Sequence, residues 1–109
     1  MGNSFQVLSQ ELGDNSLNDH YTVPDKTQAI ISGIHVSETA GGTPTYSISI
    51  AKAGAGNNDK QYLVKAKALT ANQLVVVGKG LTLNQTDVIR VLGSTAAVSF
   101  QTFGVEKTD

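Results

Sequence analysis

The sequence predicts an all-β protein, an antiparallel β-sandwich or jelly-roll-like domain with an extended N-terminal arm. Three observations predict this fold. Beyond His20, apolar residues recur with a period near two, β-branched residues are abundant, and clusters of Gly, Pro, Asn and Asp separate the apolar stretches. A chain of 109 residues is long enough for one core but hardly for two. We therefore expect an arm over residues 1–19 and a sandwich domain over residues 20–109.

The first nineteen residues differ in character from the rest. Their one short apolar run is Phe5-Gln6-Val7-Leu8, and segments rich in Gly, Asn and Ser flank it. An isolated segment with so little to bury is expected to be extended and mobile. Such a run can add a strand to the sheet edge of a neighbour, so Phe5, Val7 and Leu8 are the candidate partner contacts.

The strands expected after the arm are short and separated by turn formers. In residues 46–50, Tyr46, Ile48 and Ile50 are predicted to face inward, and the two intervening serines outward. Residues 62–68 follow the same rule, with Tyr62, Val64, Ala66 and Ala68 inward and both lysines outward. The remaining expected strands are residues 20–23, 27–37, 73–77, 87–92 and 97–105.

Charge and composition limit the classes of partner. Eight basic residues and nine acidic residues give a formal net charge of −1, so we expect neither nucleic acid nor a membrane as a partner. The chain has no Cys, no apolar run long enough to span a bilayer and no pattern of a signal peptide. The acidic residues before Lys26 are explained either by solubility or by docking on a basic neighbour.

No motif predicts catalysis, a cofactor or a metal site. Only His20 and His35 could serve as a catalytic base, and no Gly-x-Ser-x-Gly turn accompanies them. His35 and Glu38 would point to opposite faces of a strand, which excludes a shared metal ion. The stretch Asn57-Asn58-Asp59 lacks the alternating acids and the closing Glu of a calcium loop. We therefore expect a protein that is not an enzyme.

Several stretches resemble a family of small structural proteins of tailed bacteriophages. The first is residues 21–36, where Tyr21-Thr22-Val23-Pro24 leads into a long apolar strand. The resemblance continues over residues 47–51, 60–63, 80–83, 87–91 and 99–106, and the arm lies outside it. Members of this family serve as capsid decoration (cement) proteins or as tail and fibre components. The resemblance supplies no catalytic residues.

The resemblance implies a virion structural protein, with capsid decoration as the first expectation. Such a protein would be assembled in the host cytoplasm and would then lie on the outer capsid surface. There it would bridge subunits of the major capsid protein as a homo-oligomer, either a trimer or a dimer. A tail fibre or baseplate accessory is the alternative, with loops at Gly41, Gly42, Asn57 and Asn58 presented to the host surface. A carbohydrate-binding module is a further alternative, and it would need Tyr46 or Tyr62 on the surface.

Overall fold

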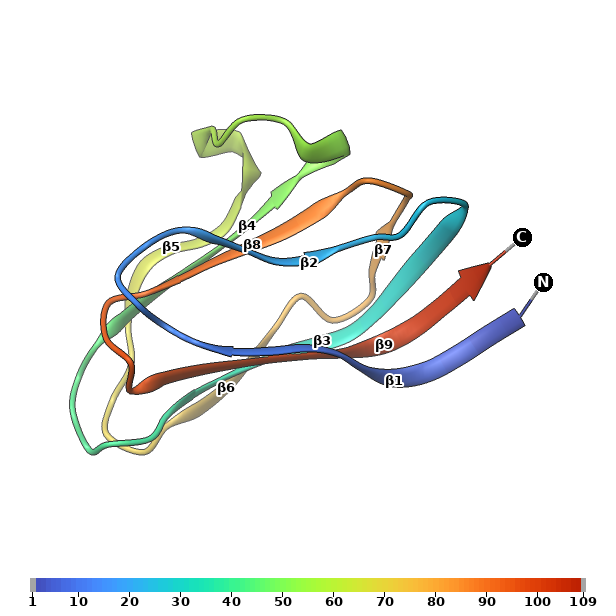
Figure 1. The fold of residues 1–109 in the computed structure, drawn as a ribbon. Helices are drawn as coiled ribbons and strands as arrows, with labels where there is room; N and C mark the ends of the chain where they lie inside the picture. The colour runs from blue at the N-terminus through green and yellow to red at the C-terminus, as the bar shows by residue number, and fades with distance from the viewer. Residues whose placement is uncertain (1, 109) are drawn as a thin grey trace.

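The computed structural model describes the backbone of residues 2–108 and the side chains of residues 6–108. Its strands form two antiparallel sheets, which Figure 1 shows as a lower and an upper layer. The lower sheet has the order β1-β9-β3-β6, with β7 also paired to β3, and the upper sheet has the order β2-β8-β4-β5. The strands are β1 (Gly2–Leu12), β2 (Asn18–Thr22), β3 (Thr27–Glu38), β4 (Thr45–Ala51), β5 (Tyr62–Ala68), β6 (Leu74–Val77), β7 (Leu81–Leu83), β8 (Val88–Gly93) and β9 (Val98–Thr108).

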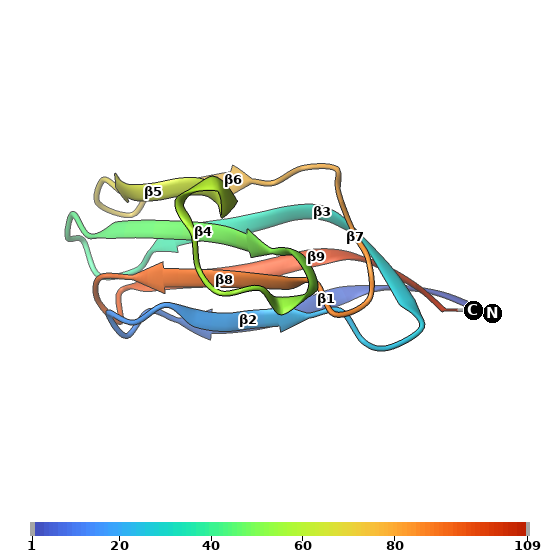
Figure 2. The same ribbon diagram turned by 90° about the horizontal axis from the view of Figure 1, so that it is seen from above.

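The strand order is that of a jelly roll. β1 pairs with β9, β2 with β8, β3 with β6 and β7, and β4 with β5. The chain is thus one long hairpin whose tip is the β4–β5 connection, rolled up so that its strands divide between two sheets. This arrangement confirms the predicted all-β sandwich. It also brings both ends of the described chain together at one end of the molecule, where Gly2 lies opposite Thr108 (Figures 1 and 2).

The core lies between the two sheets and is filled from both inner faces. Its largest fully buried side chains include Ile31 and Ile34 of β3, Tyr46 and Ile48 of β4, and Phe100 of β9. Burial of one such side chain stabilises the fold by about 1.5–3 kcal/mol. Of these residues, Tyr46 and Ile48 were predicted to face inward from the alternation in residues 46–50.

At the end of the sandwich where β1 turns into β2, the backbone of Gly13 crosses the backbone of Gly93. A Cβ atom on Gly13 would lie 2.7 Å from the Cα of Gly93, and one on Gly93 would lie 2.9 Å from the Cα of Gly13. Both positions therefore need glycine because no side chain fits between the two segments. This close approach allows the chain to cross from the lower sheet to the upper one.

The alternation predicted for β4 is only half correct. Tyr46 and Ile48 are buried as predicted, but Ser47 and Ser49, which were expected to face solvent, are buried too. The segment 52–61 forms two short 3₁₀ turns, η1 (Lys52–Gly54) and η2 (Asp59–Gln61), and folds back over the outer side of this sheet (Figures 1 and 2). The outer face of β4 is therefore covered by protein.

The prediction for β5 is wrong at its second half. Ala66 and Ala68 are exposed, because β5 is an edge strand whose register with β4 is broken twice. Ala66 adopts a positive φ of 51°, which turns the strand away from the regular pleat. Leu69, just after the strand, is the buried residue at this point.

The structure also differs from the predicted arm. Residues 2–12 form β1, which pairs along β9 from Gly2 opposite Thr108 to Leu12 opposite Ser99. β2 begins at Asn18, so the predicted boundary at residue 19 falls inside a strand. The segment is extended, as expected, but in this structure it belongs to the sandwich. None of the described residues forms a helix that is long and apolar enough to cross a membrane.

Candidate interaction surfaces

β1 is the outermost strand of the lower sheet, and no described strand pairs with its other edge. Of its three predicted contact residues, Val7 is 45% exposed, whereas Leu8 packs against the core at a break in the β1–β9 register. Leu8 is therefore not accessible to a partner while β1 holds this position. Phe5 lies opposite Val105 in the backbone pairing, and its side chain lies outside the described residues.

A buried polar cluster around His20 ties β1 to the two strands beside it. The Glu11 carboxylate of β1 only accepts hydrogen bonds, so the Nδ1 of His20 donates to its Oε1, at 2.7 Å. The Nε2 of His20 then accepts from the Thr102 hydroxyl of β9, at 2.8 Å, and Ser9 of β1 donates to the His20 carbonyl. Burial lowers the pKa of His20 and outweighs the opposing effect of Glu11. The neutral imidazole is therefore the form that fits the cluster.

A second polar link lies nearer the chain ends. The Tyr21 hydroxyl of β2 donates to Glu106 of β9, and the Gln6 amide of β1 donates to the other oxygen of the same carboxylate, at 3.0 Å. Burial, followed by this hydrogen bond, raises the pKa of Tyr21 well above its ordinary value. β1 is thus attached by side chains as well as by its strand pairing.

The first predicted contact loop, with Gly41 and Gly42, lies at the end of the sandwich opposite the chain ends (Figures 1 and 2). Both glycines are exposed, and Gly41 needs its glycine because its φ is +82°. The buried carboxylate of Glu38 stabilises the loop by hydrogen bonds to its backbone. This carboxylate accepts the backbone N–H groups of Ala40, Gly41 and Asn72, at 3.0, 2.7 and 2.9 Å.

The second predicted contact loop lies over the outer face of the upper sheet and not beside the first. Asn58 caps η2 by accepting the backbone N–H of Lys60, and Asn57 donates to the Tyr62 hydroxyl. Arg90 of β8 anchors the segment by donating to the carbonyl of Ala55, at 2.8 Å. These two asparagines are exposed, but their side chains also shape the loop.

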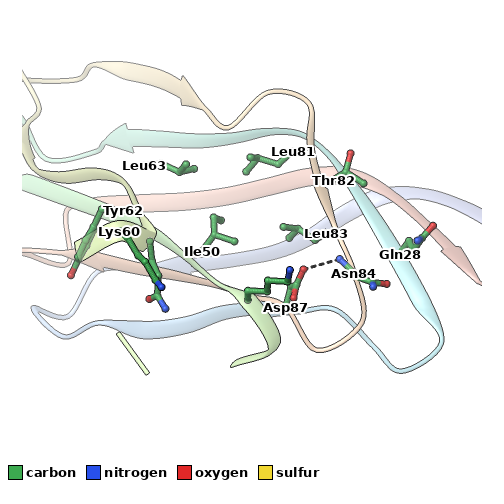
Figure 3. Close-up of a pocket in the computed structure, with 12 residues that line it drawn as sticks. Gln28, Ile50, Lys60, Tyr62, Leu63, Leu81, Thr82, Leu83, Asn84 and Asp87 are labelled. Atoms are coloured by element: carbon green, nitrogen blue, oxygen red, sulfur yellow. Dashed lines mark hydrogen bonds between the residues drawn. The ribbon is translucent and has the colours of Figure 1, made fainter. Parts of the chain in front are cut away.

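A groove of about 610 Å³ opens at the side of the sandwich where β5 and β7 form the rims (Figure 3). Its apolar lining comes from both sheets, with Ile50 and Leu63 on one side and Leu81 and Leu83 on the other. Its polar lining includes Gln28, Lys60, Tyr62, Asn84 and Asp87. Both oxygens of Asp87 accept backbone N–H groups, one from Ala53 and one from Asn84. Asp87 therefore shapes the groove.

The outer face of the lower sheet carries several apolar side chains, with polar side chains that include His35 and Gln101 between them. Val7 lies opposite Phe103, Ile30 lies opposite Val105, and Val76 lies opposite His35. This face was not among the contact surfaces predicted from the sequence. A usable signal was present, since the stretches 29–31 and 74–77 are apolar at every position, which is typical of strands covered on both faces. We define the apolar face as Val7, Leu12, Ile30, Leu74, Val76, Phe103 and Val105.

The residues considered for chemistry do not come together in the described part of the chain. His35 contacts Phe103 edge to face, at 4.7 Å between ring centroids, while Glu38 lies buried on the other side of β3. No group of three His, Asp or Glu residues between positions 2 and 108 is placed to hold a metal ion. Tyr46 is 2% exposed, so it offers no platform for a sugar, and Tyr62 lies at the groove.

The fold and these surfaces define the chain as a jelly-roll β-sandwich with an unpaired edge strand and an apolar outer face. No family model, curated protein sequence or solved structure matches the chain.

Proposed function

We propose that the chain is a structural protein of a tailed bacteriophage particle, and that it decorates the outer capsid surface. The sequence resemblance over residues 21–106 supports this proposal, as does the jelly-roll fold, which is frequent in capsid proteins. The fold by itself does not determine a function, which depends instead on the surfaces that the fold presents.

The observation that carries the proposal is the free edge of β1. An unpaired edge presents a row of backbone N–H and C=O groups, which is a template for a strand of another protein. A strand of the major capsid protein would add to this edge by main-chain hydrogen bonds. Val7 is exposed on this strand and would contact the added strand or its neighbour.

Decoration gains strength from several contacts made together. An oligomer that presents one β1 edge per copy would bridge several capsid subunits, and each contact raises the effective concentration of the next. Modest contacts then suffice to hold the capsid against outward pressure from packaged DNA. The net charge of −1 is consistent with a protein that approaches protein surfaces and not DNA.

The second candidate is a tail fibre or baseplate accessory, and the groove favours it. An apolar floor with Tyr62, Gln28 and Asn84 at its sides suits a sugar ring of a host surface, and Lys60 adds a positive charge. Under this alternative the groove and the neighbouring segment 52–61 contact the host. The free carbohydrate-binding module uses the same groove without the virion.

The test is the copy number of the chain in purified particles, followed by cryo-EM of those particles. Decoration predicts hundreds of copies spread over the capsid, with a strand of the capsid protein beside β1 in the map. A few copies confined to the tail would replace decoration by the second candidate. Absence of the chain from washed particles would overturn both virion proposals.

A further inference from the structure

Exposed apolar side chains are concentrated on one side of this molecule. Six large apolar side chains within residues 6–108 are strongly exposed, and five of them belong to the apolar face; the sixth, Leu63, lies at the groove. Their exposed fractions are 45% for Val7, 57% for Leu12, 48% for Ile30, 57% for Leu74 and 39% for Val76. Ser99 and Ser37 lie between Leu12 and Leu74 in the strand register. Scattered exposed apolar residues need no explanation, but five on the same face of one sheet are typical of a contact surface.

The charge pattern of the same face narrows the choice of partner. Its other outward side chains include Gln10, Ser37 and Gln101, and the Gln10 amide donates to Gln101 Oε1 at 3.2 Å. Among the described outward-facing side chains, only Lys107 is a Lys, Arg, Asp or Glu, and it lies opposite Gln28 at the end where the chain ends meet. The outer face of the upper sheet is different, since Arg90 and Asp19 form an ion pair across it.

We propose that the apolar face binds the apolar face of a second copy of this chain, so that the lower sheets of two molecules pack against each other. A partner with an ordinary charged surface would have to bury charges without counterparts, which is costly. A second copy brings the same surface, on which Lys107 is the only Lys, Arg, Asp or Glu among the described outward-facing side chains and His35 lies against Phe103. With a formal net charge of only −1, two copies repel each other little.

The molecule is large enough for this contact. Its two longer dimensions, 44 and 27 Å, set an upper limit of about 1,200 Å² on the area of the face, which is above the roughly 800 Å² that each partner buries in a stable complex. Two sheets pack face to face about 10 Å apart and within about 30° of parallel. A two-fold axis near Phe103 would place apolar side chains of one copy against those of the other.

This pairing leaves both β1 edges of the dimer open. The inference does not depend on the proposed capsid role, because the contact forms between two copies without a particle. If the proposed role is also correct, each dimer carries two edges for capsid subunits, and the bridging oligomer is a dimer. A trimer would require a heterologous contact that this self-complementary face does not offer.

The test is the mass of the chain in solution, measured by sedimentation equilibrium over a range of protein concentrations. We expect the wild type at twice 11.4 kDa, and we expect Ile30→Lys and Val76→Lys each to weaken dimerisation at least about tenfold. Leu63→Lys is the matched control, because it places the same charge on an exposed apolar residue away from the face. It should leave the dimer intact.

Circular dichroism and thermal unfolding establish that the variants are folded, since all three positions are exposed. A wild type that stays monomeric at high micromolar concentration overturns the inference, and so does a dimer that Leu63→Lys disrupts while the two face variants do not. A monomer found at hundreds of copies on the capsid would contradict the dimer and support the proposed function. A dimer that is absent from particles would support the dimer and contradict the proposed function.

Discussion

His20 is a buried residue whose ionisation affects the stability of the fold at mildly acidic pH. Because burial lowers its pKa in the folded chain, protons bind more readily to the unfolded chain as the pH falls below the ordinary value of about 6.5. The contribution of His20 to stability is therefore complete above that pH and is lost as the pH falls toward the lowered pKa. We expect the free energy of unfolding in urea to drop more steeply between pH 7 and pH 5 for the wild type than for His20→Gln. Equal slopes would show that His20 does not titrate in this way.

Two buried serines on β4 provide a matched pair of substitutions. Ser47 Oγ accepts the backbone N–H of Ala66 at 2.8 Å, whereas Ser49 Oγ is buried with no hydrogen-bond partner among the described residues. A buried hydroxyl without a partner costs free energy, so Ser49→Ala should leave stability unchanged or raise it by up to about 1 kcal/mol. Ser47→Ala should lower it by about 1 kcal/mol. Urea unfolding measures the free energy of unfolding of both variants. A larger decrease for Ser49→Ala than for Ser47→Ala would contradict the view that only Ser47 makes a stabilising hydrogen bond.

Glu38 connects two loops through one carboxylate. Hydrogen bonds from the backbone, that of Asn72 first, lower the pKa of Glu38, so the ionised form that holds the loops persists to acidic pH. Glu38→Ala should increase amide hydrogen exchange at Ala40, Gly41 and Asn72 and leave the exchange of β8 amides unchanged. The same substitution would then show how much rigidity the Gly41 loop owes to this one side chain. Unchanged exchange at those three amides would mean that the loops hold their own shape.

At the scale of strands, the alternation of apolar and polar residues predicted buried positions reliably only where one face of a strand is exposed to solvent. It identified residues 27–37 and 97–105 as strands, but it could not place both Ile31 and Ile34 inside, because the register shift between Ile31 and Gly33 brings them onto one face. It failed on β4, because the segment 52–61 covers the second face, and that covering is a long-range event which no local pattern encodes. β7 was missed as a separate strand because three residues are too few to show a period.

Because local sequence patterns do not encode long-range contacts, they predicted neither the pairing of β1 nor the position of the interaction surfaces. β1 pairs with residues about a hundred positions away, so a local pattern with one short apolar run could not reveal its partner. The candidate contacts Val7, Gly41 and Gly42 are exposed, and they lie on different parts of the molecule. The apolar face is assembled from four strands, and only their register brings Ile30, Phe103 and Val76 onto one side.

The segment 52–61 is an element whose attachment can be tested. Arg90 reaches it with two nitrogens, which donate to the carbonyls of Ala55 and Gly54, and its third nitrogen donates to Asp19. Lys cannot reproduce this planar fork, so Arg90→Lys should lower the free energy of unfolding by about 1–2 kcal/mol. Asp19 is 64% exposed, and Asp19→Asn should cost less than about 0.5 kcal/mol. Urea unfolding compares the two, and equal losses would mean that the ion pair holds the segment.

At the scale of the whole molecule, the rolled hairpin gives a way to separate two forms of strand docking. β1 either keeps its place and binds a capsid strand along its free edge, or it leaves β9 and pairs with a neighbour. Gly2 and Thr108 are paired, so a linker of about three residues joins the two ends into a β1–β9 hairpin. New ends between Gly56 and Asn57 fall in an exposed part of the segment 52–61, with open space around Gly56.

We expect this circular permutant to keep the fold and its stability within about 1 kcal/mol, because ends that lie together tolerate such joining. Refolding should be faster than for the wild type, since the β1–β9 pairing becomes local. β1 in the permutant is tied to β9 at its start, so it cannot leave as a free arm, yet its outer edge stays open. Capture by particles that lack the protein should therefore equal that of the wild type. Normal folding with lost capture would show instead that β1 must leave the sandwich to bind, and docking along the free edge would be wrong.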